Sequence, residues 1–126
     1  MRPERFTEQA REVLAASQAI ASRYHHVQWD VEHILLALLQ QEKGLVGEIL
    51  RELKVNVETI RRQVEAVLEK TPRLDYKTQQ IYATPRVGQL LQTAEAEAER
   101  LKDEYISTEH LLIATADGDG AARDIL

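Results

Sequence analysis

The chain has 126 residues, about the size of one domain, and 44% of them are apolar. Charged residues make up 29%, the net charge is −5 and no basic stretch occurs, so neither nucleic acid nor an anionic membrane is an expected partner. The lack of cysteine excludes disulfides, thiolate metal sites and cysteine nucleophiles. The longest apolar run, Ile34 to Leu39, is far too short for a membrane span, and the N-terminus has no apolar signal region. These features predict a cytoplasmic protein.

The sequence repeats itself at a distance of 77 residues. That shift places Thr7 on Thr84 and Leu14 on Leu91 without a gap. The same register lays Glu32-His33-Ile34-Leu35 on Glu109-His110-Leu111-Leu112. A gapless register with matches at helical spacing indicates a tandem duplication of a small helical unit.

The first helix of each copy is predicted to begin at a threonine. Thr7 and Thr84 are favourable N-caps, and Pro85 stands at the first helical position, where its missing N–H costs nothing. The helix after Thr84 is expected to run to about Lys102, and its predicted inward-facing residues are Leu90, Leu91, Ala94, Ala98 and Leu101.

The second helix of each copy is predicted to be central and buried. Asp30 and Ser107 are its expected N-caps, and an almost entirely apolar body follows. Gly44 ends the helix of the first copy and opens a third, which reaches about Leu53, and Asn56 caps a fourth.

The predicted fold is therefore all-α, with two tandem pseudo-symmetric four-helix repeats in one domain over residues 1–126. Repeat one is assigned to 4–70, the linker to 71–83 and a truncated repeat two to 84–126. Pro72 and the absence of helical periodicity mark the linker, with a short extended piece near 80–83. Because the second copy stops where the first continues into another helix, the chain is expected to be a piece of something longer.

Catalytic and metal chemistry find little support in the sequence. The Glu-His pairs lie 77 residues apart with no His-x-x-x-His, which predicts no metal site. Serines without a nucleophile elbow and the lack of a Gly-rich phosphate loop predict that the chain itself is not an enzyme. His25 and His26 are expected to be solvated loop residues, and Trp29 is expected to pack in the core beneath its loop.

Four segments resemble the N-terminal repeats of Clp-type AAA+ unfoldases: RFTEQAREVL, VEHILLALL, YATPRV and RLKDEYISTEHLL. The resemblance covers about Glu4 to Leu126, and the last segment is closer to the ClpB disaggregase type than to the ClpC type. Lys54 stands where the family usually has a helix-ending glycine, and Val31 and Val57 stand where proline is common.

The resemblance implies a domain that captures unfolded or aggregated polypeptides, with adaptor proteins as further partners. It also implies a hexameric parent protein that binds ATP, whereas this chain is expected to hold no cofactor and to be a monomer by itself. Thr7, Asp103 and Glu109 match positions of a polar surface patch that handles substrate. Glu32 and the apolar Leu91 complete the predicted substrate-binding set.

Two other functions stay open at this point. The chain could resemble the ClpC type in reading phosphoarginine, with Glu32 and Glu109 holding the guanidinium and helix N-termini holding the phosphate. It could instead be a free-standing adaptor without an ATPase. The histidines of the two Glu-His pairs are interpreted as core side chains. The apolar residues Leu90, Leu91, Tyr105 and Ile106 could either face the core or line an exposed groove.

Overall fold

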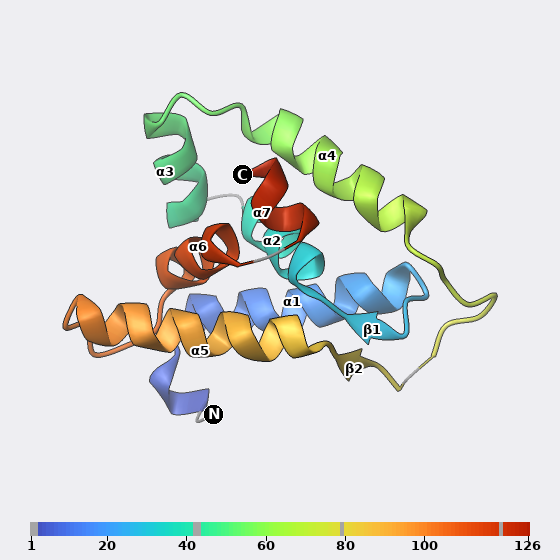
Figure 1. The fold of residues 1–126 in the computed structure, drawn as a ribbon, viewed down its shortest axis with the longest axis horizontal. Coiled ribbons are helices and arrows are strands. Elements are labelled where there is room, and N and C mark those ends of the chain that lie inside the picture. The colour runs from blue at the N-terminus through green and yellow to red at the C-terminus, as the bar shows by residue number, and fades with distance from the viewer. Residues whose placement is uncertain (1–2, 42–43, 79, 119) are drawn as a thin grey trace.

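The computed structural model describes residues 3–41, 44–78, 80–118 and 120–126, and helices form most of it (Figure 1). After a 3-10 turn at Pro3–Arg5, the helices are α1 (Glu8–Arg23), α2 (Val31–Gln40), α3 (Leu45–Glu52), α4 (Val57–Lys70), α5 (Pro85–Arg100), α6 (Thr108–Asp117) and α7 (Ala121–Ile125). The two strands, β1 (Gln28–Trp29) and β2 (Tyr82–Ala83), have two residues each. The all-α prediction is confirmed, including the short extended piece in the linker.

Helix α2 lies at the centre of the molecule, with α1, α4 and α6 packed around it (Figure 1). Every residue from Val31 to Leu39 is buried, as the apolar run predicts. The helix begins at Asp30, whose backbone N–H donates to Nδ1 of His33. In return, the side chain of Asp30 accepts from the backbone N–H of His33. This reciprocal cap fixes the imidazole of His33 against the start of the helix.

The first helices of the two copies begin and end alike. Oγ1 of Thr7 accepts from the N–H of Ala10, and Oγ1 of Thr84 accepts from that of Val87. Both helices then end in a residue with left-handed backbone, His25 at φ 61° and its counterpart Lys102 at φ 59°. The helix from Thr84 ends at Arg100, two residues before the predicted position.

Two short parallel contacts tie the copies together crosswise. Strands β1 and β2 pair Trp29 with Ala83, and an isolated bridge pairs Phe6 with Ile106. The 77-residue shift relates the two contacts, because it moves Phe6 onto Ala83 and Trp29 onto Ile106. Each copy therefore places its loop beside the start of the other copy's first helix. The exact limits of the two repeats stay a prediction.

The prediction of two solvated histidines at 25 and 26 is wrong for His26. Its side chain is only 1% exposed and stacks on Tyr24 with ring centroids 5.3 Å apart. His25 is half-buried. Trp29 is partly buried against the core, as expected, and its indole N–H donates to Oγ of Ser17 at 2.8 Å. Among the described residues, no helix has the length and apolar composition needed to cross a membrane.

Candidate functional site

The crosswise contacts create two related polar sites, one at each N-terminus of the central helices. Site two consists of Thr7, Asp103, Ser107, Glu109 and His110. Nε2 of His110 lies 2.8 Å from Oδ2 of Asp103, and Oγ of Ser107 donates to Oε1 of Glu109 at 3.0 Å. The N–H of Ser107 donates to Nδ1 of His110, so the imidazole proton is on Nε2 and points to Asp103. The imidazole is buried, whereas 45% of the Asp103 side chain is exposed.

Thr7 reaches site two through the bridge between the copies. Its N–H donates to the carbonyl of Ile106 at 3.0 Å, and the N–H of Ile106 donates to the carbonyl of Arg5 at 2.8 Å. The start of α1 therefore lies beside the loop that carries Asp103 and Glu109. This is the adjacency that a joint patch of the three residues requires, while their role toward substrate stays a prediction.

The apolar residues that the sequence offered for an exposed groove divide between core and surface. Ile106 is fully buried, and Leu90 is in the core. Leu91 is half-buried on α5 and packs partly against the core, so its exposed part is small. Leu101 and Tyr105, which flank Asp103 in sequence, are 46% and 49% exposed. Sequence reasoning considered Tyr105 for a groove but missed Leu101, because helical periodicity assigned that leucine to the inner face.

Site one is the counterpart at the start of α2 and consists of Thr84, Asp30, Glu32, His33 and Arg86. Arg86 pairs with Asp30, and Oγ1 of Thr84 donates to Oδ1 of Asp30 at 3.0 Å. Burial raises the pKa of Asp30, but hydrogen bonds from Arg86, Val31 and Thr84 outweigh burial and leave that pKa lowered. In site one, the protein's own guanidinium therefore neutralises the carboxylate at the helix start.

Glu32 is buried in site one, unlike its half-buried counterpart Glu109 in site two. The side chain is 9% exposed, and its Oε2 has no hydrogen-bond partner among the described residues. Burial, and then the nearby carboxylate of Asp30, raise the pKa of Glu32. Its Oε1 lies 3.9 Å from the guanidinium of Arg86, beside a cavity of about 230 Å³. The predicted substrate residue Glu32 thus stands in a different site from Thr7, Asp103 and Glu109.

Site two also has the one described group of side chains with metal-ligand spacing. The ligand atoms of Asp103, Glu109 and His110 lie within 4.8 Å of one another. Sequence spacing missed this group because Asp103 precedes the Glu-His pair across a loop. A metal ion on Nε2 of His110 would displace its proton to Nδ1, which already faces the N–H of Ser107 at 2.8 Å. The hydrogen bonds therefore favour the proton over a metal ion.

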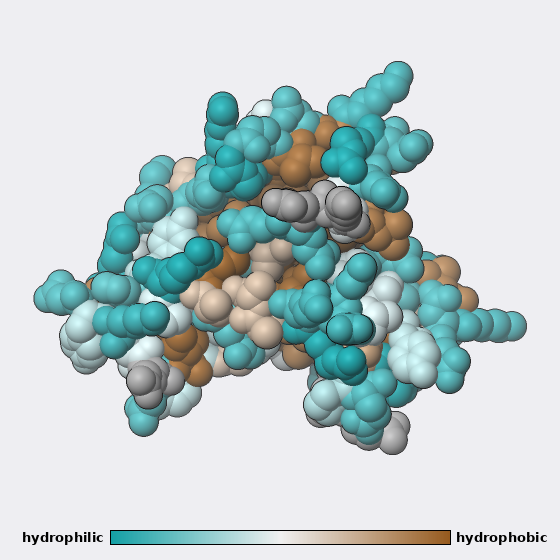
Figure 2. Space-filling model, turned by 180° about the vertical axis from the view of Figure 1, so that it is seen from behind, coloured by the Kyte–Doolittle hydropathy of each residue, from teal (hydrophilic) through white to brown (hydrophobic). Residues whose placement is uncertain are grey.

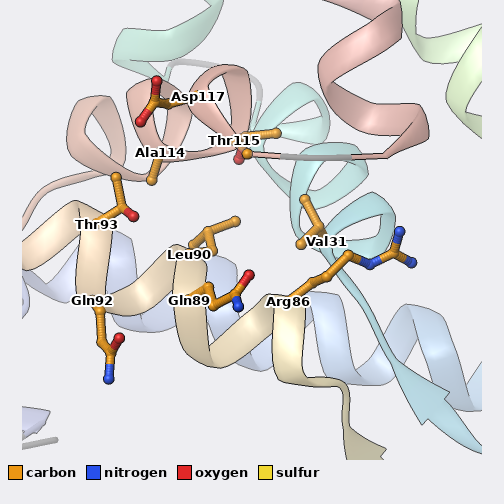
Figure 3. Close-up of a pocket in the computed structure, with 10 residues that line it drawn as sticks. Val31, Arg86, Gln89, Leu90, Gln92, Thr93, Ala114, Thr115 and Asp117 are labelled. Atoms are coloured by element: carbon orange, nitrogen blue, oxygen red, sulfur yellow. The ribbon is translucent and has the colours of Figure 1, made fainter.

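A pair of grooves, also related by the 77-residue shift, lies between the first and second helices of each copy. The groove between α5 and α6 has a volume of about 300 Å³ and includes Leu90, Thr93, Ala114 and Asp117 in its lining (Figure 3). Its counterpart between α1 and α2 has a volume of about 290 Å³. The face drawn in Figure 2 shows apolar surface in separate areas broken by hydrophilic side chains.

Comparison with known proteins assigns the chain to a family. The model of the Clp repeat (R) N-terminal domain matches residues 5–126. The chaperone protein ClpB 1 of Synechocystis is 38% identical over 124 residues, covering 98% of this chain and 14% of that protein. The negative regulator of genetic competence ClpC/MecB of Bacillus subtilis is 34% identical over 123 residues, covering 97% of this chain and 15% of that protein.

Solved structures agree on the fold. The Hsp104 N-terminal domain from Candida albicans matches with a TM-score of 0.85 at 22% identity, over 95% of this chain and 78% of that one. The chain spans only 14% of the length of the first ClpB relative. By sequence and by fold, this chain belongs to the Clp repeat N-terminal domain family.

Proposed function

We propose that this domain captures unfolded or aggregated polypeptides for a Clp-type chaperone, and that site two makes the first contact. The observation that carries the proposal is the pairing of an exposed carboxylate, Asp103, with two exposed apolar neighbours, Leu101 and Tyr105. Unfolded chains expose apolar side chains and unpaired backbone N–H groups together. An apolar contact with a polar rim matches both features.

The chain acts in this proposal as a binding module without catalytic groups of its own. ATP hydrolysis and the hexameric ring belong to the parent protein, and adaptor proteins are further partners of the same surface. The domain sequence and its chaperone relatives support this division of labour.

Binding of a permanently unfolded, fluorescently labelled model protein, followed by anisotropy, tests the proposal. Asp103→Asn keeps an acceptor for the imidazole of His110, and Glu109→Gln keeps one for Ser107. Each variant is expected to weaken binding several-fold and to leave the melting temperature nearly unchanged, because exposed carboxylates contribute at most about 1 kcal/mol to stability. Leu101→Ser and Tyr105→Ser are expected to weaken binding further.

The matched control is Glu99→Gln, which removes an exposed carboxylate near the end of α5, outside site two. If all these variants bind like the wild type, site two does not contact substrate. If Asp103→Asn unfolds the domain while binding per folded molecule stays intact, Asp103 has only a structural role.

A second candidate function is recognition of a phosphoarginine tag. The buried and unpartnered Oε2 of Glu32 favours it, because a donor group could complete that carboxylate. Arg86 acts against it by already occupying site one. Calorimetry with free phosphoarginine should show binding that the double variant Glu32→Ala/Glu109→Ala abolishes. A wild type that gives no heat of binding would rule this candidate out.

A further inference from the structure

Two buried imidazoles, His26 and His33, form a direct hydrogen bond in repeat one. Their side chains are 1% and 2% exposed, and Nδ1 of His26 lies 2.8 Å from Nε2 of His33. The rings are tilted by 57° with centroids 5.1 Å apart, and Tyr24 stacks on His26. In repeat two, the 77-residue shift replaces the first imidazole by the carboxylate of Asp103.

The backbone fixes where the protons of this pair lie. The N–H of Asp30 donates to Nδ1 of His33 at 2.9 Å, so His33 carries its proton on Nε2. That proton is donated to Nδ1 of His26, and His26 must therefore carry its own proton on Nε2. Both imidazoles are neutral in this arrangement. A further proton on either Nδ1 would place two donors face to face at less than 3 Å.

The pair lies beneath the beginning of the linker. The N–H of Leu74 donates to the carbonyl of His25 at 2.9 Å, and Nδ1 of His25 lies 3.3 Å from the carbonyl of Leu74. Further along, the N–H of Tyr82 donates to the carbonyl of Val27. His26 and linker residues 71–74 together line a cavity of about 410 Å³. The linker is thus held on a loop that the two imidazoles support from inside.

Charged groups on every neighbouring element act on the pair. Burial, and then the adjacent His26, lower the pKa of His33 to about 4 against the opposing effect of Asp30. Burial also lowers the pKa of His26, opposed by the Leu68 carbonyl and by Glu69, while Arg73 of the linker acts with burial. Near His33, the carboxylate of Asp30 is already engaged by Arg86 of α5, and Glu32 is buried beside them. No described carboxylate accepts a hydrogen bond from either imidazole.

We propose that the His26–His33 pair is an acid-sensitive latch, in which uptake of a proton breaks the hydrogen bond between the imidazoles and releases linker residues 71–74 from the loop at 25–28. The released state exposes the imidazoles to water, where they bind protons from about pH 6.5 downward. The closed state binds protons only at lower pH. The equilibrium constant for opening is therefore independent of pH above about pH 7 and increases as the pH falls below it.

The size of the effect follows from the two affinities for the proton. With a closed-state pKa of about 4 for His33 and an open-state value of about 6.5, the opening constant is about 30-fold larger at pH 5 than at pH 8. Repeat two lacks the latch, because the group facing Nε2 of His110 is the carboxylate of Asp103 and not a second imidazole.

Nuclear magnetic resonance of the whole 126-residue chain tests the latch. The imidazole nitrogen shifts of His26 and His33 should both show the Nε2–H tautomer at pH 7.5. Between pH 7.5 and 5, the Leu74 amide should lose about 30-fold in protection after correction for intrinsic exchange, while the amides of α5 and α6 keep theirs. An Nδ1–H tautomer in either ring, or equal loss of protection throughout the helices, would overturn the proposal.

Reciprocal substitutions separate the latch from general acid effects. His26→Asp gives repeat one the pairing of repeat two and should keep Leu74 protected at pH 5. The control His25→Asn removes the neighbouring titratable ring at a left-handed position that asparagine tolerates, and acid release should persist. Loss of release in His25→Asn with its retention in His26→Asp would overturn the latch. If His26→Asp does not fold, Asp103→His decides, because it should make the Ile106 amide newly acid-sensitive, and an unchanged Ile106 amide contradicts the latch.

Discussion

At the scale of single residues, the backbone carries strain that the sequence does not relieve with glycine. His25, Lys54 and Lys102 all adopt left-handed conformations, with φ between 59° and 61°. For residues with a Cβ this conformation costs roughly 1–2 kcal/mol. Lys54 ends α3, and its side chain is exposed.

We predict that Lys54→Gly stabilises the domain by about 0.5–1 kcal/mol, because glycine adopts this backbone without strain and gives back part of the gain as entropy of the unfolded chain. Urea denaturation measures the change. Lys54→Ala is the matched control, since it removes the same side chain and keeps the Cβ. A gain of equal size in the alanine variant would attribute the effect to the lost charge instead.

Local chemistry predicted the caps but not the burial of polar side chains. Thr7, Thr84 and Asp30 were predictable because a cap bonds to backbone within three residues. The burial of His26 was not, because it depends on His33 in the next helix and on α4, beyond any local pattern. The ion pair of Asp30 and Arg86 joins residues that only the crosswise packing brings together.

At the scale of elements, the start of α2 depends on a partner from α5. Arg86 has a 42% exposed side chain, and Asp30 an 18% exposed one, so solvent screens their attraction in part. Because the pKa of Asp30 is lowered in the folded state, its contribution to stability is present above about pH 4, the unfolded value, and is lost as the pH falls below it.

Arg86→Gln is therefore expected to lower the free energy of unfolding by about 1 kcal/mol at pH 7 and by less at pH 3. The pKa of Asp30, followed by carboxyl carbon shifts, should rise in the variant. Arg100→Gln, which breaks an exposed pair with Glu97 on one helix, should leave stability unchanged. An equal loss at both pH values would mean that Arg86 stabilises by packing and not by charge.

The boundaries of elements followed the sequence where signals were local. Asn56 and Gly44 marked helix starts correctly, because each interrupts an apolar period with a residue suited to a cap. The pairing of β1 with β2 was not predictable. Strands of two residues have no period to detect, and they exist only because the 77-residue symmetry brings two loops to two helix starts.

At the scale of the whole molecule, the copies share one core. Phe6 is 6% exposed and belongs to the same cluster of buried residues as Ile34, Val64 and Leu111. Helix α2 packs against helices of both copies (Figure 1). From this shared core we expect that neither copy of the duplication is stable by itself.

We predict that the domain unfolds in a single transition. The variant Phe6→Ala tests whether a change at the contact between the copies destabilises both of them together. Phe6 packs at the bridge to Ile106 of repeat two, and the single tryptophan, Trp29, reports on repeat one. Removing the ring should cost about 3 kcal/mol by loss of burial and by the cavity left behind. Unfolding curves from tryptophan fluorescence and from helical circular dichroism in urea should coincide in the wild type and shift together in the variant.

Leu101→Ala, at a 46% exposed position on the repeat-two side, should shift both unfolding curves little. A Phe6→Ala variant in which helical signal is lost at lower urea than tryptophan fluorescence would show that repeat one persists alone, and that the shared core does not couple the copies.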